Sequence, residues 1–211
     1  IDEEQRYNLF ELIGDVSFED SYINKAKLTT SFFTDALESK ELFANLTTDF
    51  DFPLSYLYSD ANDLKLKTTL EFLKGEFNQD YQGFDNERYS IFTASLQPQY
   101  QFSYLDFSVK AGLKIYASLD FTNKANNFLI YPNLDISTPI VKNYVSLYAG
   151  VSGDLKTNTY SNFVDDNPFV SPTLFITQTS ENYNYFLGFN GKITNSINFN
   201  VKGAYKFEED K

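Results

Sequence analysis

Apolar and polar residues alternate one by one along most of this chain. Over residues 105–121 the odd positions are apolar and the even positions are mostly polar, as the neighbours Leu113 and Lys114 illustrate. The same period of two returns over residues 145–152 and 197–207. Strict alternation over so many residues predicts β-strands with one apolar face and one polar face.

This alternation divides the chain into about ten predicted strands. No segment predicts a convincing helix, and the best candidate, residues 34–43, is interpreted as a loop or a single turn. No linker or change of composition splits the chain, so residues 1–211 are predicted to form one β-domain. The predicted strands lie near residues 7–18, 22–33, 40–52, 63–74, 88–101, 104–121, 127–138, 142–155, 183–193 and 196–207.

The connections between the predicted strands alternate between short and long. Short turns at one end and long loops at the other are typical of bacterial outer-membrane barrels. Because the number of predicted strands is even, the first strand begins at the end with the long loops, and the last strand ends there too. We therefore expect an internal or incomplete section of a larger barrel. The short connections are 101–104, 139–142 and 194–196, and the long ones are 75–87, 123–126 and 157–182.

Alternation alone does not tell which face points outward, because a soluble barrel or a β-sandwich has its apolar face inside. Strands of a dozen residues exceed the usual globular length and suit a tilted membrane crossing. Charged residues in mid-strand suit a polar interior. These features predict an all-β, antiparallel, up-and-down transmembrane β-barrel. Aromatic residues near the strand ends, as in interfacial girdles, are Tyr100, Phe102, Phe50, Phe52, Phe121, Tyr183, Tyr185, Tyr205 and Phe207.

Composition narrows the possible chemistry. The chain has 17 basic and 29 acidic residues and a net charge of −12, which argues against a nucleic-acid partner. It contains no His, Cys, Met or Trp, so Ser-His-Asp triads, Cys nucleophiles and the common zinc sites are excluded. No apolar run is long enough for a spanning helix. We therefore predict no catalytic residues, no cofactor and no metal.

Charged residues on the predicted polar faces are candidates to line the lumen. Asp49 and Asp51 form a carboxylate pair on one strand face, although a simple polar lumen face beside Lys65 and Lys67 explains them better. Five lysines on three strands are candidates for a cation-lined interior, with two aspartates available to neutralise them. The candidate lumen residues are Lys110, Lys114, Lys192, Lys202 and Lys206, with Asp106 and Asp120.

Two loops carry candidate recognition residues. Residues 165–167 and 85–87 offer the oxygen ligands that Ca²⁺ prefers, but neither has the spacing of an organised ion loop, which favours solvated loops. The apolar pair Phe169 and Val170 lies between two prolines. This stretch folds inward, meets a partner, or forms a packed loop tip. The candidate recognition residues are Asn167, Pro168, Phe169, Val170 and Pro172.

Four segments carry a resemblance to a known family. They are residues 128–137, 141–153, 167–174 (Asn-Pro-Phe-Val-Ser-Pro-Thr-Leu) and 185–193. Over residues 88–211 the chain resembles the barrel portion of Bacteroidota outer-membrane proteins grouped with TonB-dependent receptors, and the segment 167–174 is the most specific element. The resemblance implies outer-membrane location and barrel architecture. Neither a plug domain nor a TonB box is visible.

Three functions remain open after these observations. The first is passage or uptake of solutes across the bacterial outer membrane, with the loops as the recognition surface. The second is a structural barrel subunit of an outer-membrane assembly that holds surface lipoproteins or another barrel. The third is a soluble ligand-binding β-barrel. In the first two functions the partner of the apolar face is outer-membrane lipid. A barrel enzyme is disfavoured because the chain lacks His as general base.

Overall fold

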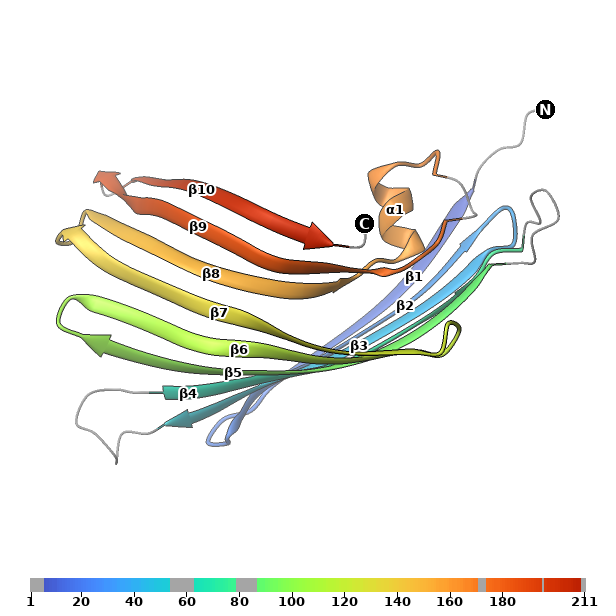
Figure 1. Cartoon of the computed structure of the whole chain (residues 1–211), viewed down its shortest axis with the longest axis horizontal. Coiled ribbons are helices and arrows are strands. Elements are labelled where there is room, and N and C mark those ends of the chain that lie inside the picture. Colours follow the sequence, from blue (N-terminus) through green and yellow to red (C-terminus); the bar gives the residue numbers. More distant parts are fainter. Residues whose placement is uncertain (1–5, 54–62, 79–86, 171–173, 195, 210–211) are drawn as a thin grey trace.

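A computed structural model of the chain is an all-β fold in which ten antiparallel strands form one curved sheet (Figure 1). The structure describes residues 6–53, 63–78, 87–170, 174–194 and 196–209. Every strand pairs with the next one along the chain, and within the described residues β1 and β10 are not paired with each other, so the sheet is open. The strands are β1 (Tyr7–Ser17), β2 (Ile23–Asp35), β3 (Lys40–Pro53), β4 (Asp63–Glu76), β5 (Arg88–Tyr104), β6 (Phe107–Asp120), β7 (Ala125–Val141), β8 (Val145–Thr157), β9 (Gln178–Thr194) and β10 (Ile197–Glu209).

The ten predicted strands and their up-and-down order are confirmed. The largest difference is at β9, which begins at Gln178, five residues before its predicted start. The register between β9 and β10 shifts between Phe207 and Glu208, and the register between β8 and β9 shifts between Ser152 and Asp154. A β-bulge breaks the period of two, and this break hid the first residues of β9 from the pattern.

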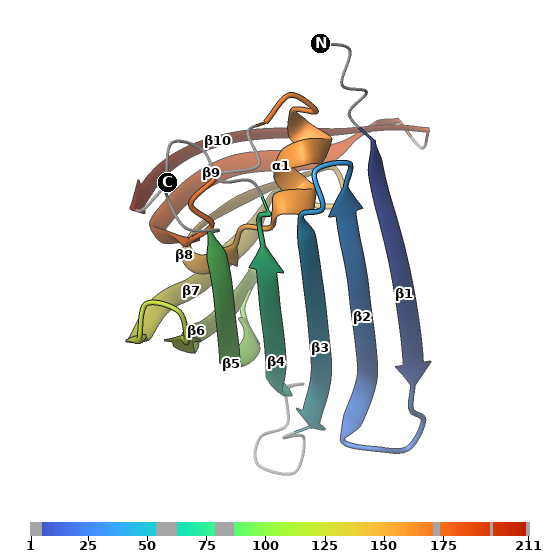
Figure 2. The same cartoon turned by 90° about the vertical axis from the view of Figure 1, so that its right-hand side faces the viewer.

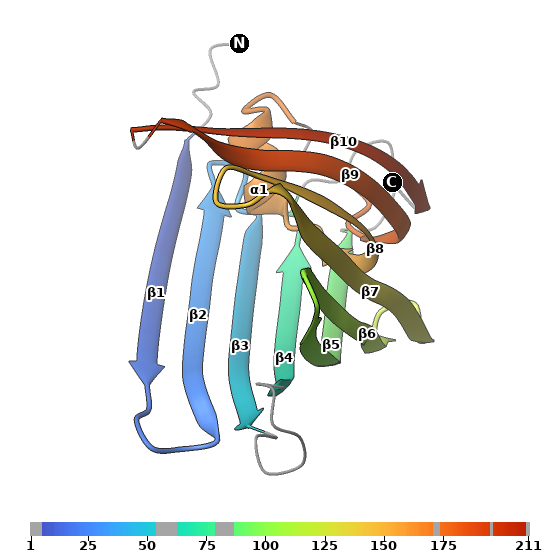
Figure 3. The ribbon, with the colours of Figure 1, turned by 90° about the vertical axis from the view of Figure 1, so that its left-hand side faces the viewer.

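A short helix contradicts the prediction that the chain has none. Helix α1 (Tyr160–Asp166) lies in the connection between β8 and β9, and its N-cap Thr159 accepts a hydrogen bond from the Asn162 amide. Seven residues are too few to display a helical period in the sequence. Figures 2 and 3 show α1 on the concave side of the sheet, beside β1–β3. The interpretation of residues 34–43 as a non-helical connection is correct, because β2 ends at Asp35 and β3 begins at Lys40.

The two ends of the sheet carry different connections. The short turns between β5 and β6, β7 and β8, and β9 and β10 lie at the end opposite α1, as predicted. The alternation is not strict, because β3 and β4 are joined at that same end by residues 54–62, which lie outside the described residues. At the α1 end, the β6–β7 connection, predicted to be long, has only four residues, 121–124. β1 begins and β10 ends at the α1 end (Figure 1).

A small apolar core fills the space between α1 and the concave face. The ring of Tyr160 packs edge-on against Phe33, with centroids 5.3 Å apart, and against Phe77, with centroids 4.9 Å apart. This burial holds α1 against the sheet by removing apolar surface from water. The buried core residues are Phe33, Leu73, Phe77, Tyr89, Tyr160, Val164 and Ile176.

Candidate functional site

The convex face of the sheet is a continuous apolar surface. Along each strand, side chains of this face alternate with side chains of the concave face. Residues of the convex face pair with one another from strand to strand, as Leu46, Leu70 and Ala94 do. Soluble monomers rarely expose contiguous apolar patches of more than a few hundred Å². The exposed large apolar side chains of this face include Phe10, Leu12, Val16, Leu28, Phe32, Leu42, Leu46, Leu70, Leu96, Leu113, Phe128, Ile130, Ile136, Leu187, Phe189, Val201 and Tyr205.

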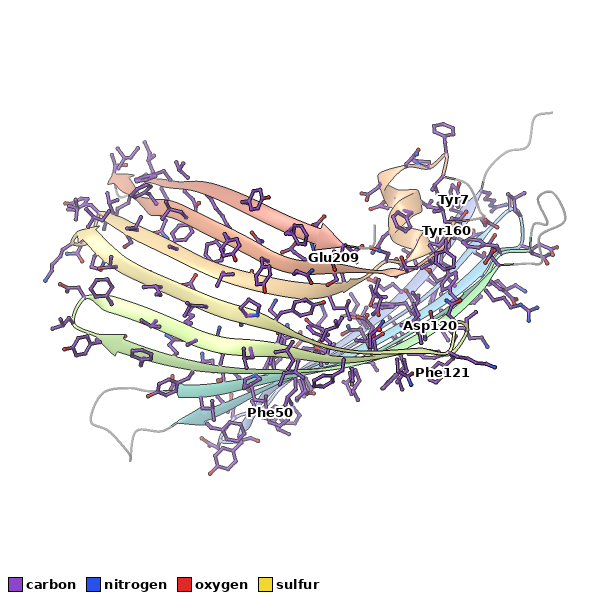
Figure 4. The ribbon with its side chains drawn as sticks, in the orientation of Figure 1. Tyr7, Phe50, Asp120, Phe121, Tyr160 and Glu209 are labelled. Carbon is purple, nitrogen blue, oxygen red and sulfur yellow. The ribbon has the colours of Figure 1, made fainter. Side chains whose placement is uncertain are left out.

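Aromatic rings gather near both edges of this convex surface. At the end opposite α1, Phe50 and Phe52 stack with centroids 6.3 Å apart, and Tyr100 and Phe102 stack at 5.5 Å. Phe50 lies on the outer side of the sheet in Figure 4. At the α1 end, the exposed aromatic residues Phe121 and Phe128 lie beside the β6–β7 turn, and Figure 4 shows Phe121 there. Two aromatic bands separated by an apolar zone match the arrangement at a membrane's two interfaces.

Charged side chains are confined to one rim of the convex face on β1–β7. The register places all of them at the strand ends beside α1, where Arg88 and Glu76 approach to 3.9 Å. Between this rim and the aromatic residues of the opposite end, the convex face of these seven strands carries no charge. The charged residues of the rim are Lys40, Lys74, Glu76 and Arg88.

The concave face is polar, and its side chains bond across intervening strands. The Gln178 amide of β9 donates to Thr93 of β5 at 2.8 Å, and its carbonyl accepts from Ser118 of β6. Tyr131 of β7 bonds to Ser180 of β9 at 2.7 Å. Such contacts are possible only because the curvature brings these side chains together, which fixes the polar face as the inner one.

Charges on the concave face compensate one another on the β6–β10 side. Lys114 Nζ lies 2.9 Å from the Asp154 carboxylate, which also accepts a hydrogen bond from the Tyr116 hydroxyl. Glu181, whose side chain is 5% exposed, receives Lys156 at 2.8 Å and Lys206 at 3.3 Å. The attraction of the paired lysines offsets much of the free energy that is lost when a carboxylate is removed from water.

The structure places six of the seven predicted lumen residues on the concave face and the seventh, Asp106, in a turn. Lys110 pairs in register with Gln101 and Asp135, and Lys202 lies 4.5 Å from the centre of the Phe186 ring. Lys192 lies over the Tyr144 ring at 5.7 Å, and Lys114 and Lys206 make the ion pairs above. Asp106, by contrast, lies in the β5–β6 turn, where it faces Lys142 at 3.6 Å.

Asp120, the other predicted aspartate, caps a turn. Its carboxylate accepts hydrogen bonds from the Thr122 and Asn123 amides at 2.9 Å, which closes the β6–β7 turn. The expectation that Asp106 and Asp120 neutralise Lys110 and Lys114 therefore finds no contact among the described residues, since Asp154 is the partner of Lys114. The sequence could not identify Asp154 as this partner, because Asp154 of β8 reaches Lys114 of β6 across the intervening strand β7.

A buried carboxylate anchors α1 to the sheet. Glu41 of β3 is 2% exposed and accepts hydrogen bonds from the Tyr160 amide at 2.6 Å, the Ser161 amide at 3.0 Å and the Tyr89 hydroxyl at 2.6 Å. A carboxylate is favoured there because the first amides of a helix have no partner within the helix. Glu41 thus fixes where the connection between β8 and β9 enters the concave side.

Asp35 provides a second anchor for the same helix. Its carboxylate accepts hydrogen bonds from the amides of Leu37 and Ser39 and from the Tyr160 hydroxyl at 3.0 Å. Burial, followed by the Asp35 carboxylate, raises the pKa of Tyr160 well above its ordinary value of 10.0. The hydroxyl therefore remains protonated and keeps donating to Asp35 throughout the physiological pH range.

Gly75 gives the Tyr89 ring access to Glu41. The register places Gly75 of β4 between Glu41 and Tyr89, and a Cβ at position 75 would lie 2.1 Å from Tyr89 Cζ. We expect Gly75→Ala to displace this ring, break the Tyr89–Glu41 bond and lower the free energy of unfolding by about 1.5–3 kcal/mol, the worth of a hydrogen bond to a charged group. Urea unfolding measures the change.

Gly14→Ala is the matched control for this substitution. A Cβ at Gly14 would have no atom within 4 Å, so this change is expected to alter the unfolding midpoint little. If Gly75→Ala is as harmless as Gly14→Ala, the Tyr89–Glu41 contact contributes nothing to stability.

The predicted recognition loop follows α1 directly. Asn167 is the C-cap of the helix, and its side chain accepts a hydrogen bond from the Phe169 amide at 3.1 Å. Pro168 accepts a hydrogen bond from the Tyr7 hydroxyl at 2.7 Å, which ties the loop to β1. Val170 packs against the core, whereas Phe169 is 86% exposed. The loop therefore packs inward at Val170 but not at Phe169, and Pro172 lies outside the described residues.

The other acidic candidates resolve more simply. Asp49 pairs in register with Lys67 and Asp51 with Lys65, as the polar-face interpretation predicts. Within the described part of the chain, no group of three or more acidic side chains is placed to hold a metal ion. Residues 85 and 86 of the second acidic loop are outside it.

Sequence reasoning missed Glu41, Asp35 and Tyr160, the three residues that place α1. One signal in the sequence could have indicated this helix. Phe43 and Leu73 pair with each other on the face whose other positions on β3 and β4 are mostly polar. Apolar residues on the inner face at one end indicate that a further segment packs there.

Comparisons with protein-family models, with curated proteins and with solved structures each give no match. In the described ranges, no helix has the length and apolar character needed to cross a membrane.

Proposed function

We propose that this chain forms part of the wall of a bacterial outer-membrane β-barrel through which solutes pass or are taken up. The observation that carries the proposal is the distribution of side chains on the curved sheet. Exposed apolar residues cover the convex face, and the concave face is polar and internally hydrogen bonded. A transmembrane barrel requires this arrangement, with lipid outside and a polar interior.

The curvature of the sheet argues against a soluble ligand-binding barrel. A soluble barrel buries its apolar face inside and exposes its polar face to water. Here the strands curve the opposite way, toward the polar residues. The strand lengths of 11–17 residues also suffice for a crossing, which takes about 9–11 residues on a tilt.

The free edges of β1 and β10 require partners in a lipid environment. Unpaired backbone groups cost several kcal/mol each in hydrocarbon, and among the described residues both strands pair on one side only. We propose that further strands complete the barrel, in the manner of the TonB-dependent-receptor-like proteins that the sequence resembles. The helix α1 then lies inside the barrel near one end and narrows it.

A structural subunit of an outer-membrane assembly is the second candidate. The observation in its favour is Phe169, a large apolar side chain that is 86% exposed on the loop after α1. Exposed aromatic residues on a fixed loop suit binding to a surface lipoprotein or another barrel.

Conductance separates the two candidates. Purified full-length protein that shows a heat-modifiable gel shift is inserted into planar lipid bilayers, and stepwise conductance is expected if the polar interior is an open path. Correctly folded and inserted protein without conductance would contradict passage and favour the structural role.

A further inference from the structure

We infer that the charged rim of the convex face binds the phosphate group of a membrane lipid. The binding site is a hollow at the α1 end of β3–β5 with a volume of about 330 Å³, and Lys40, Lys74 and Arg88 line it. This basic hollow lies on the face that meets lipid in the proposed function. The inference therefore rests on that function, and it deepens it by naming the headgroup chemistry that one end of the face selects.

Three neighbouring strands bring the basic side chains together. Lys40 of β3 pairs in register with Glu76 of β4, and Glu76 pairs with Arg88 of β5. Two residues before Glu76, Lys74 of β4 pairs with Leu42 of β3. All of these positions have the parity of the convex face, so the three cations occupy one small area of it. Guanidinium and ammonium groups are the side chains that bind phosphate oxygens.

The positive charge of the basic hollow is only partly compensated. Arg88 Nε lies 3.9 Å from the Glu76 carboxylate, whereas Lys40 and Lys74 form no ion pair within the described residues. Glu41 also borders the hollow, but its carboxylate is directed to the concave side, where it accepts the first amides of α1. Three cations and one carboxylate thus leave an excess of positive charge on the convex side of a chain whose net charge is −12.

The apolar residues beside the basic hollow suit the acyl chains of the same lipid. Phe32 and Leu42 line the hollow, and both are exposed. Leu46 and Leu70 continue this apolar surface away from the rim. On the described part of β1–β7, the convex face carries no other charged side chain. Positive charge at the edge of a lipid-facing apolar surface is the arrangement that recognises anionic lipid headgroups, and free phosphate would have no use for the apolar part.

Quenching by brominated lipids tests this assignment on full-length protein in vesicles. The chain has no Trp, so Phe32→Trp introduces a reporter at the basic hollow, and Phe50→Trp introduces the same reporter at the opposite edge of the convex face. The vesicles consist of phosphatidylcholine with a minor share of phosphatidic acid, and one of the two lipids is brominated at a time. Near Phe32→Trp, we expect phosphatidic acid to bind at least about tenfold more tightly than phosphatidylcholine. Near Phe50→Trp, we expect no such preference.

Neutralisation of single lysines is the second arm of the test. Lys40→Gln and Lys74→Gln, each combined with Phe32→Trp, are expected to weaken the preference for phosphatidic acid about fivefold, the contribution of one basic side chain near an anionic lipid surface. The matched control is Lys65→Gln, which removes the same charge from the concave face of β4. This control should leave the preference unchanged.

Several outcomes would overturn the assignment. They are equal quenching by the two lipids at Phe32→Trp, the same preference at Phe50→Trp, or an equal loss in Lys65→Gln. Loss of the preference in inorganic phosphate, but not in sodium chloride of the same ionic strength, would assign the basic hollow to free phosphate instead of lipid.

Quenching by brominated phosphatidylcholine separates this inference from the proposed function. If that lipid quenches both reporters and phosphatidic acid shows no preference, only the assignment of the basic hollow is contradicted. If neither lipid quenches either reporter in protein that shows the heat-modifiable gel shift, the contact of the convex face with lipid is contradicted as well.

Discussion

Lysine in place of Val201 is expected to lower the free energy of unfolding by about 2–4 kcal/mol when the protein is folded in a lipid bilayer. Val201 lies on the convex face and is 63% exposed in the isolated sheet. If this face meets lipid, the ammonium group must enter hydrocarbon, and the cost is greatest near the bilayer midplane. If the face met water, a lysine at an already exposed position would change stability by no more than about 0.5 kcal/mol.

The neighbouring residue supplies the control at the same depth. Asn200 points to the concave side, where it accepts a hydrogen bond from Tyr148 at 2.9 Å, so Asn200→Lys is expected to be nearly neutral. Leu113→Lys and Ser108→Lys repeat the comparison on β6, with Leu113 outside and Ser108 inside. Urea titration of protein in lipid vesicles measures all four variants. Equal tolerance at the outer and inner positions would refute the orientation.

Removal of the Glu41 carboxylate is expected to release α1 from the concave face. In Glu41→Ala, the Tyr89 hydroxyl and the amides of Tyr160 and Ser161 lose their common acceptor. Each buried donor left without an acceptor costs about 1–3 kcal/mol. A helix of seven residues is not stable by itself, so it cannot offset this loss. Limited proteolysis within residues 158–177 is expected to become at least tenfold faster, while the sheet keeps its strands.

Glu38→Ala is the control for this effect. Glu38 lies in the turn between β2 and β3, and its carboxylate accepts a bond from Asn78 at an exposed position. Its loss should leave the cleavage rate of residues 158–177 unchanged. A Glu41→Ala protein in which that segment is cleaved no faster than in Glu38→Ala would show that apolar packing alone holds the helix.

The strands of the sheet can be predicted from the sequence, whereas the helix α1 cannot. Alternation such as that of Leu113 and Lys114 reports the pleat of a strand directly, so the strands and the two faces follow from it. The lysine partners of Asp49 and Asp51 could also be predicted, because neighbouring strands in a meander align by simple register. Which face is concave does not follow from alternation and becomes visible only in the curvature.

The site around α1 depends on contacts between distant parts of the chain. Glu41 and Tyr160 are 119 positions apart, and no local pattern links a carboxylate on one strand to the amides of a later loop. The partners of Lys114 and Lys206 were missed for related reasons. Asp154 of β8 reaches Lys114 of β6 across β7, which the register of neighbouring strands does not show. A bulge of β9 near Asn182 shifts the parity of Glu181, the partner of Lys206. Periodicity thus predicts the strands of the sheet. The contacts between distant residues on the concave side can be identified only from the three-dimensional structure.

The central claim is that the convex face meets lipid, and labelling of single cysteines tests it most directly. The chain has no cysteine of its own, so each of residues 111–117 can be replaced in turn and labelled with an environment-sensitive fluorophore. In vesicles that contain brominated lipid, we expect quenching at the odd positions, such as Leu113 and Ile115, and little at Lys114 and Tyr116. Quenching at the even positions, or an absence of any period of two, would contradict the account.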